Sequence, residues 1–220
     1  GVALASRGLT PDARRRQSVV HCKEPAPPAS AARPVTLHLT GFGPFGGVAE
    51  NPTSIICKLL KDFVERGTAP EGVSAELLEE FSSARIALEG LDALEVSAEA
   101  CRANVPAIVG GLARRGGRDQ GLTALVHMGV SGAARQICLE CRGVNVADFR
   151  IPDVRGLQTA GEPVVPGAEQ VLYTPLRLPE LLGELRDRGV PCEISTDAGR
   201  YICNYIFFTS LHETKSTGIP

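Results

Sequence analysis

The sequence lacks the features of a membrane-spanning or a nucleic-acid-binding protein. No apolar run approaches the roughly 20 consecutive residues that a helix needs to cross a bilayer. Lysine and arginine (23 together) nearly balance aspartate and glutamate (25), and the net charge of −2 provides no basic surface for a nucleic-acid backbone. We therefore expect neither a membrane nor a nucleic acid as a partner.

Motifs for metals and nucleotides are also missing. Cys138 and Cys141 form one CxxC pair, but no second pair follows at the spacing of a zinc site. The glycine-rich stretch GFGPFGG (41–47) has neither the GxGxxG spacing nor the Lys-Ser/Thr ending of a phosphate-binding loop. The sequence therefore predicts no metal and no cofactor.

Cysteine is present, but its pattern argues against a disulfide framework. The chain has 7 cysteines, an odd number, at irregular spacings. Scattered thiols of this kind are typical of proteins in a reducing compartment. We therefore expect a cytoplasmic location.

Residues 1–34 differ in composition from the rest of the chain. They contain three consecutive arginines (14–16) and the stretch PAPPASAARP (25–34), and no apolar segment typical of a secretory signal follows the arginines. The first residue is glycine rather than methionine. We expect residues 1–34 to be a disordered tail or a gene-model artefact, and residues 35–220 to form one domain.

Strand and helix patterns alternate from residue 35 onward. VTLHLTGF (35–42) alternates apolar and polar residues like a strand, and a glycine loop (41–47) follows. Asn51-Pro52 is a typical helix start, and Gly67 is a natural end for that helix. The next predicted elements are weak strands at 73–78 and 84–88, a helix over 97–115 with Pro106 inside it, and a central strand in the apolar run 122–130.

The second half of the chain continues this alternation. Residues 137–153 suggest two short strands separated by Gly143, and a helix runs from Pro179 to Gly189. A strand at 192–196 and a last helix from about Ile202 complete the pattern. The elements predict an α/β protein, a three-layer αβα sandwich with a mainly parallel (mixed) central sheet.

One cysteine lies where a helix can activate it. In STDAGRYICNYIFFTSL (195–211) a strand leads into a glycine turn, which places Cys203 in the first turn of the next helix. The free N–H groups and the dipole of a helix start favour a thiolate, and the same N–H groups can receive an oxyanion during acyl transfer. A buried structural cysteine is the commoner reading of a helical cysteine, so these features make Cys203 a candidate only.

A thiolate nucleophile also needs a base, usually a histidine held by a carboxylate or amide. His21 lies in the first 34 residues, and His38 and His127 fall within predicted strands. His212 follows Cys203 on the same predicted helix, more than two turns away. These residues alone leave the base unassigned.

Three stretches, in this order, resemble the pyroglutamyl-peptidase I family. They are LTGFGPFGG…NPT (39–53), HMGVSGAARQICLECRGVNVADFRIPD (127–153) and STDAGRYICNY (195–205). The resemblance covers about residues 35–220. It implies a cysteine peptidase that removes N-terminal pyroglutamyl groups from small peptides by acyl transfer to its cysteine, without a cofactor. The sequence leaves the oligomeric state open, and we favour a monomer.

The resemblance assigns three catalytic positions. Cys203, in the AGxxxCN pattern, matches the nucleophile of the family. Glu140, in ICLECRGVN, matches the carboxylate that orients the catalytic histidine. Arg150, in DFRIPD, matches an arginine close to the reaction centre. Taken alone, Glu140 and Arg150 would be ordinary surface charges.

The resemblance also assigns a substrate pocket, whose members are Phe42, Phe45, Asn51, Val130, Ile151 and Tyr201. The two phenylalanines match aromatic residues that sandwich the flat pyrrolidone ring. Asn51 matches a polar position near the pocket, and the other three match wall positions. An uncharged lactam is recognised by aromatic faces and a few aimed backbone groups rather than by an ion pair. Without the resemblance, the phenylalanines would be read as anchors that hold the glycine loop to the core.

The sequence departs from the family in two places. The stretch F-[IV]-H-[IV]-P, which supplies the catalytic histidine of the family, does not occur before Pro220, so we expect a domain that is incomplete at its C-terminus. Residues 76–97 are acidic and less strand-like than the family pattern, which leaves the substrate preference open.

These departures keep two alternatives open. One is a catalytically impaired paralogue or isoform that binds a pyroglutamyl ligand without efficient hydrolysis. The other, which the intact GFGPFGG and DFRIPD motifs disfavour, is a different thiol enzyme on the same fold, such as an amidase or transferase.

Overall fold

A sheet of three parallel strands forms the centre of the computed structural model, which describes residues 35–84, 86–116 and 121–219. The strands are β1 (Val35–Phe42), β2 (Ile86–Leu94) and β3 (Leu122–His127), in the order β2-β1-β3. The described residues belong to one compact unit. The predicted tail, residues 1–34, lies outside the described residues.

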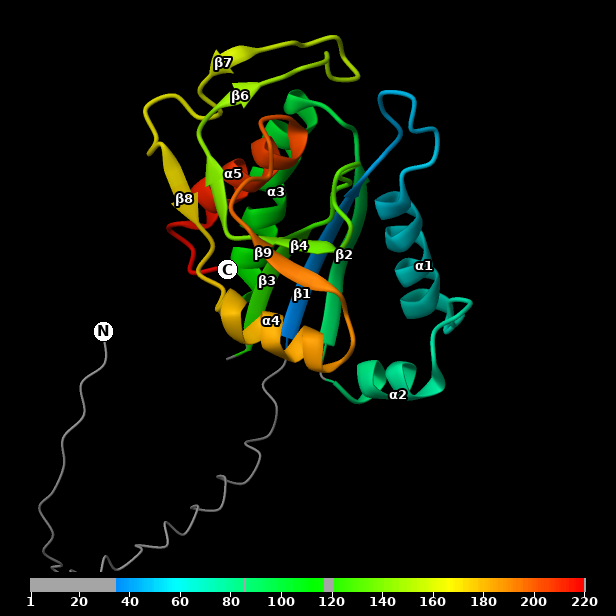
Figure 1. The fold of residues 1–220 in the computed structure, drawn as a ribbon. Helices are drawn as coiled ribbons and strands as arrows, with labels where there is room; N and C mark the ends of the chain where they lie inside the picture. The colour runs from blue at the N-terminus through cyan, green and yellow to red at the C-terminus, as the bar shows by residue number, and fades with distance from the viewer. Residues whose placement is uncertain (1–34, 85, 117–120, 220) are drawn as a thin grey trace, which may run out of the picture. The chain divides into compact units, whose positions relative to one another are not determined.

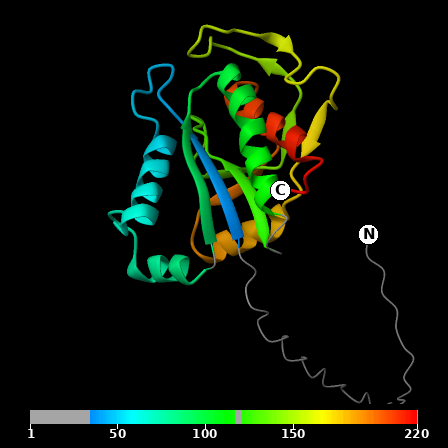
Figure 2. The same ribbon diagram turned by 180° about the vertical axis from the view of Figure 1, so that it is seen from behind.

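Helices cover both faces of this sheet. Successive strand residues point to opposite faces, and the end of β1 shows the two sides. Gly41 faces α1 (Pro52–Arg66), where a Cβ on Gly41 would lie 2.5 Å from the Thr53 carbonyl oxygen. Phe42 faces the hydrophobic core that α3 (Ala98–Gly116) and α5 (Ile202–Thr214) build on the other side (Figures 1 and 2). The predicted α/β fold with a mainly parallel central sheet is confirmed.

Short strands extend the structure beyond the central sheet. β4 (Ile137–Glu140) pairs with β9 (Cys192–Ser195) in parallel, while β5 (Arg142–Val144) pairs with β8 (Val171–Tyr173) and β6 (Ala147–Asp148) with β7 (Ala160–Glu162), both antiparallel. The helix α4 (Leu178–Asp187) packs beside β9. Among the described residues, none of the helices combines the length and apolarity needed to traverse a membrane.

Two helix boundaries agree with the capping signals in the sequence. The Asn51 side chain accepts a hydrogen bond from the Thr53 N–H at the start of α1, and Pro52 occupies the first helical position. Gly67 ends the same helix in the left-handed conformation, with φ of 66°. Local capping chemistry therefore sets both ends of α1.

The segment between α1 and β2 differs from the prediction. A strand was expected at 73–78, but the chain forms a helix there, α2 (Ala75–Ser83). The Ser74 side chain caps this helix by accepting a hydrogen bond from the Leu77 N–H at 3.2 Å. The cap and the strong helix formers in AELLEE outweigh a weak strand pattern. The strand expected at 84–88 is present as the longer β2.

Two further details of the sheet prediction are wrong. β3 was expected to be a central strand, but within the described residues it pairs only with β1. Leu122, at the start of β3, is 45% exposed. Gly143 was expected to separate two strands, but it lies inside β5, and the break falls at Cys141. A Cβ on Gly143 would lie 2.9 Å from the Phe208 Cα, so this glycine marks the close approach of α5 rather than a turn.

Candidate active site

Cys203 is the second residue of α5, as the strand–turn–helix pattern predicts. Gly199, with φ of 77°, makes the turn after β9, and Tyr201 is the N-cap of the helix. The backbone of Gly129 and Val130, just beyond β3, lies against the sulfur. The Val130 N–H donates a hydrogen bond to Cys203 Sγ, and a Cβ on Gly129 would lie 2.7 Å from the same atom. Two distant parts of the chain therefore meet at this thiol.

The environment of Cys203 favours the thiol over the thiolate. Burial raises the pKa of Cys203, and the negative charge of Glu140 raises it further. Hydrogen bonds from the backbone N–H groups of Val130 and of Cys203 itself act in the opposite direction. The N–H groups at the helix start therefore lower the pKa of Cys203 as expected, but desolvation of the buried thiol raises this pKa by more.

Glu140 ends β4 and interacts electrostatically with Cys203. Burial raises the pKa of this carboxyl, the nearby charge of Asp197 adds to the effect, and a hydrogen bond with the Ser195 side chain opposes it. Glu140 Oε2 is buried and has no hydrogen-bond partner in the described part of the chain. This oxygen is free to accept a hydrogen bond from a proton-carrying group beside the thiol.

Aromatic rings gather next to the start of α5. The Tyr201 ring centroid lies 5.0 Å from that of Phe149, edge-on, and 6.4 Å from that of Phe45. The Tyr201 hydroxyl donates to the Pro152 carbonyl oxygen at 3.1 Å. Ile151 Cδ1 lies 3.4 Å from the position that a Cβ on Gly46 would take. The structure thus places the predicted wall residue Tyr201 beside the predicted sandwich residue Phe45, and Ile151 beside Gly46, the residue after Phe45.

Two predicted pocket residues are engaged elsewhere. Phe42 is 3% exposed and packs in the hydrophobic core. Asn51 is 1% exposed, and its side chain donates to the Gly43 carbonyl oxygen at 3.0 Å and accepts from Thr53 Oγ1 at 2.8 Å. Both side chains therefore hold the glycine loop in place. Their contact with a substrate stays a prediction.

The last two predicted residues lie at the edge of this region. Val130 is 37% exposed, so its side chain borders solvent while its backbone contacts the Cys203 sulfur. Arg150 is exposed, and its positive charge opposes the rise in the pKa of Tyr201 that burial causes. Arg150 is therefore near the ring cluster, and its role at the reaction centre stays a prediction.

Asn204 is a site residue that the sequence interpretation missed. Its fully buried side chain accepts a hydrogen bond from the Val144 N–H at 2.8 Å and donates to the carbonyl oxygens of Val144, at 2.8 Å, and Val146, at 3.0 Å. These bonds fasten the first turn of α5 to β5. An asparagine in the otherwise apolar run ICNYIFF is the signal that could have pointed to it.

Asp153, in the DFRIPD motif, is a second missed residue. Its carboxylate accepts a hydrogen bond from the Ala98 N–H at 3.0 Å, at the start of α3, and others from the N–H groups of Arg155 and Leu157, each at 2.9 Å. Asp153 is 5% exposed. It holds the loop that carries Arg150 and Ile151 against α3.

The histidines within residues 35–219 that the structure describes make no hydrogen bond to the Cys203 thiol. His127 hydrogen bonds to Thr40 and Ser210, and His38 pairs with Asp92 at 2.9 Å. The base stays unassigned.

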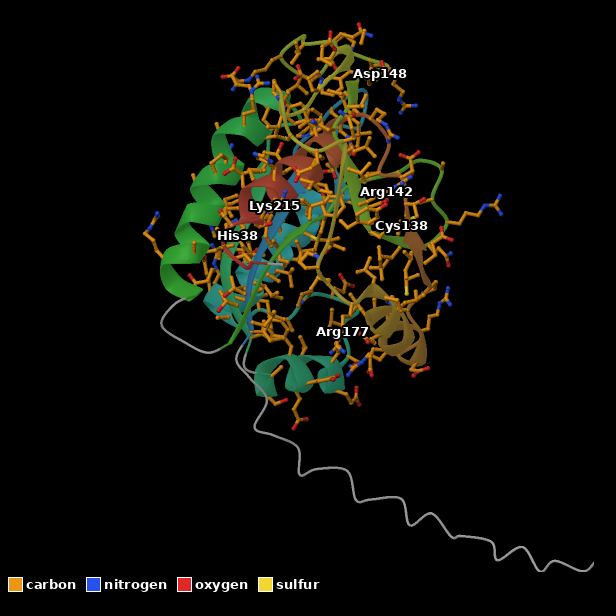
Figure 3. All side chains as sticks on the ribbon, turned by 90° about the vertical axis from the view of Figure 1, so that its left-hand side faces the viewer. His38, Cys138, Arg142, Asp148, Arg177 and Lys215 are labelled. Atoms are coloured by element: carbon orange, nitrogen blue, oxygen red, sulfur yellow. The ribbon has the colours of Figure 1, made fainter. Side chains whose placement is uncertain are left out.

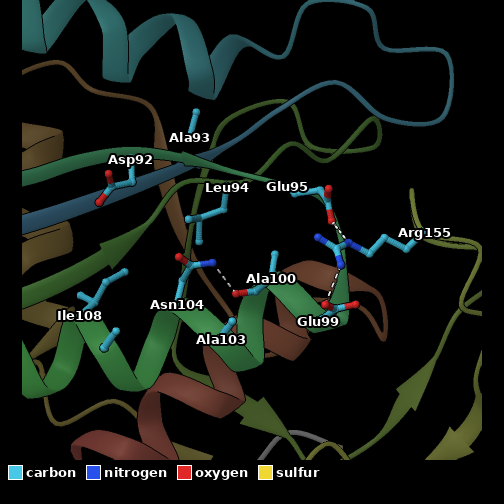
Figure 4. Close-up of a pocket in the computed structure, with 11 residues that line it drawn as sticks. Asp92, Ala93, Leu94, Glu95, Glu99, Ala100, Ala103, Asn104, Ile108 and Arg155 are labelled. Atoms are coloured by element: carbon cyan, nitrogen blue, oxygen red, sulfur yellow. Dashed lines mark hydrogen bonds and ion pairs between the residues drawn. The ribbon is translucent and has the colours of Figure 1, made fainter.

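A hollow of about 430 Å³ lies away from the thiol, between the end of β2 and α3. Arg155 closes one side of it by pairing with Glu95 and, at 2.6 Å, with Glu99 (Figure 4). Cys203 does not line this hollow. The ion pairs add to the attachment of the 153–157 loop to α3.

The CxxC pair lies on and just after β4. Cys138 Sγ is 3.7 Å from Glu193 Oε1 on β9, and Arg142 follows on β5 (Figure 3). Across the described ranges, no three His, Cys, Asp or Glu side chains gather as metal ligands would. Cys138 therefore belongs to the paired strands β4 and β9, and Cys141 directly follows Glu140 at the end of β4.

Known proteins resemble this chain in sequence. A family model described as pyroglutamyl peptidase matches residues 112–220. The pyrrolidone-carboxylate peptidase of Pyrococcus furiosus is 32% identical over 182 residues, which cover 83% of this chain and 74% of that protein. The corresponding peptidase of Chromobacterium violaceum is 33% identical over 178 residues, covering 80% and 71%.

Solved structures resemble the chain in fold. The crystal structure of a mutant pyrrolidone carboxyl peptidase from P. furiosus matches with a TM-score of 0.64 and 28% identity, covering 84% of this chain and 76% of that one. The Thermococcus litoralis enzyme matches with a TM-score of 0.60 and 29% identity, covering 84% and 72%. The likeness therefore extends over most of both chains.

Proposed function

Because this chain belongs to the pyroglutamyl peptidase family, a family of cysteine peptidases, we propose that it removes an N-terminal pyroglutamyl group from small peptides with Cys203 as nucleophile. The observation that carries the proposal is the contact between Cys203 Sγ and the Gly129–Val130 backbone at the start of α5. A thiol beside backbone N–H groups supports the proposal, because such N–H groups can stabilise the oxyanion of an acyl transfer.

The reaction is an acyl transfer in two steps. Cys203 Sγ attacks the carbonyl carbon of the pyroglutamyl residue, the negative charge that develops on the carbonyl oxygen is stabilised by backbone N–H groups, and the C–N bond breaks to give a thioester and a free amine. Water then hydrolyses the thioester and regenerates the thiol. The thiol proton must leave for the attack, and a proton must reach the departing amine.

Substrate recognition uses the ring cluster beside α5. Phe45, Tyr201 and Ile151 offer an apolar, partly aromatic wall, which suits a flat and uncharged lactam. Arg150 lies at the rim, where a positive charge can assist the developing oxyanion. Glu140 is proposed to orient the proton-carrying group through its unpaired Oε2.

A second candidate function is ligand binding with little hydrolysis. Two observations favour it: no described histidine hydrogen bonds to Cys203, and the surroundings of Cys203 raise the pKa of its thiol. The loss of general acid–base help slows a reaction by about 10²–10⁴-fold.

We place either activity in the cytoplasm and in a monomer. The six described cysteines are all unpaired, which is consistent with that compartment.

The test compares turnover of a pyroglutamyl fluorophore amide by the native chain, Cys203→Ser and Cys138→Ser. We expect Cys203→Ser to lower turnover at least about a thousandfold, because the reaction runs through its sulfur. Cys138→Ser, a partly exposed cysteine outside the site, should keep native turnover. Native turnover by Cys203→Ser would refute the nucleophile.

Calorimetry with a pyroglutamyl peptide separates the two candidates. Binding together with turnover supports the peptidase, and binding without turnover supports the ligand-binding protein. If neither binding nor turnover is observed, both proposals are wrong.

A further inference from the structure

Hydrogen bonds join three side chains that come from β1, β3 and α5. His127, the last residue of β3, contacts Thr40 Oγ1 on β1 through Nδ1 and Ser210 Oγ on α5 through Nε2, both at 2.6 Å. We call Thr40, His127 and Ser210 the three-element tie. Both ring nitrogens are used, so the side chain joins two strands to a helix.

The imidazole in this tie is neutral. Burial of the ring lowers the pKa of His127 to about 3, and the nearby His38 contributes in the same direction. A neutral imidazole has one donor and one acceptor nitrogen, so one hydroxyl donates to the ring while the other accepts from it. The tie therefore keeps the same hydrogen bonds across the neutral pH range.

Two members of the tie, His127 and Ser210, lie on the segments that carry the proposed active site. Gly129 and Val130, which contact the Cys203 sulfur, directly follow His127 and Met128. Ser210 lies seven residues after Cys203 on α5, a spacing that places both on the same side of the helix. The Met128 N–H also donates to the Thr40 carbonyl oxygen at 2.8 Å, so the backbone beyond His127 remains attached to β1.

We propose that His127 is a positioning residue: by fixing the end of β3 to α5, it sets the Val130 N–H against the Cys203 sulfur. This inference rests on the proposed role of Cys203 as nucleophile. His127 does not touch the reacting atoms, so it acts through the distance between two backbone segments. A histidine that only stabilised the sheet would leave the acidity of the Cys203 thiol unchanged.

The experiment measures how fast Cys203 in the full chain is alkylated by iodoacetamide as the pH is raised, with peptide mass spectrometry to separate Cys203 from the other cysteines. In His127→Phe we expect the midpoint of the profile to move up by about one pH unit, because the thiolate loses a hydrogen bond. Glu140, whose charge also acts on this thiol, stays in place, and so do Cys101 and Tyr201, whose pKa values the Cys203 thiolate raises.

Two further variants separate positioning from general loosening. His127→Gln keeps an amide that can reach the Ser210 hydroxyl, and its midpoint should return toward the native value. His38→Gln removes the other strand histidine, which pairs with Asp92 instead of the tie, and should leave the midpoint unchanged. A shift in His38→Gln equal to that in His127→Phe would overturn the proposal.

Circular dichroism checks that each variant is folded. A folded His127→Phe protein with the native alkylation midpoint would overturn the inference. If His127→Phe does not fold, Ser210→Ala removes one bond of the tie, and its midpoint should move up by a smaller amount; no movement there would equally overturn it. Alkylation needs no substrate, so a chain without peptidase turnover still tests the tie.

Discussion

At the scale of single residues, the site depends on glycines that leave room for a neighbour. A Cβ on Gly129 would lie 2.7 Å from Cys203 Sγ, and a Cβ on Gly90 would overlap the His38 ring. Neither glycine has a positive φ, so space and not backbone conformation restricts these positions. Gly129 therefore matters because of what it touches.

We predict that Gly129→Ala lowers the free energy of unfolding by about 1–3 kcal/mol, because the added methyl group overlaps the sulfur and forces α5 or the loop to move. Urea denaturation measures the change. Gly132→Ala is the matched control in the same loop, since no atom lies within 4 Å of its added methyl group. It should stay within about 0.5 kcal/mol of the native chain. Equal effects of the two substitutions would contradict this explanation.

The residue scale also shows what sequence can and cannot indicate about the site. The position of Cys203 followed from a local pattern of strand, glycine turn and helix, and local patterns are read directly from sequence. The raised pKa of its thiol did not follow, because burial comes from Gly129 and other residues far away in the chain. Asn51 shows the same difference: its role as a helix cap followed from the local Asn-Pro pattern, whereas its contact with a substrate depends on distant residues and stays a prediction.

At the scale of elements, the Asn204 side chain fastens α5 to β5. Asn204 gives the backbone of Val144 both a donor and an acceptor, as a neighbouring strand would. Gly143 allows the helix to approach, with a Cβ position only 2.9 Å from the Phe208 Cα. Cys203, the proposed nucleophile, is therefore carried by a helix that is fixed at its first turn.

We predict that Asn204→Ala lowers the free energy of unfolding by about 2–5 kcal/mol, because three partly buried bonds are lost at once. The Val144 N–H and the Val146 carbonyl oxygen lose their bonds to Asn204, and the Val144 carbonyl oxygen keeps only its bond from the Val146 N–H. Thermal and urea unfolding both report this change. Asn104→Ala is the control, since the Asn104 amide bonds to Ala100 within its own helix. A loss below about 1 kcal/mol in Asn204→Ala would show that water replaces these bonds.

Elements were predicted well where their ends carry capping signals. The sequence signals Asn51-Pro52 and Gly67 define α1, and the structure has the same limits. The prediction of a strand at 73–78 is wrong because the apolar alternation there is weak and Ser74 caps a helix instead. The position of β3 in the sheet was wrong because an apolar run does not indicate how many strands will pair with it.

At the scale of the whole molecule, a buried carboxyl makes stability depend on pH. Burial raises the pKa of Glu140 above its ordinary value of 4.5, so the folded chain keeps a proton that the unfolded chain has already lost. Between these two pKa values the folded state binds more protons, and the stability contribution of Glu140 falls as the pH rises. Above the folded pKa the contribution is constant.

We predict that Glu140→Gln removes this decline, so the free energy of unfolding falls less steeply as the pH rises above 4.5. Urea denaturation at a series of pH values measures the slope. Glu193→Gln, on the paired strand β9, controls for the loss of one carboxylate. Identical slopes in the native chain and in Glu140→Gln would rule out this source of pH dependence.

The close fit of α5 against Gly143 has a consequence for how specificity can change during evolution. A helix that cannot slide keeps the proposed nucleophile in place, so under the proposed function adaptation to a new peptide falls to the loops around Phe45 and Ile151. Those loops can accumulate substitutions while the Cys203 sulfur stays where it is. A lineage can therefore change the peptides it accepts without rebuilding its chemistry.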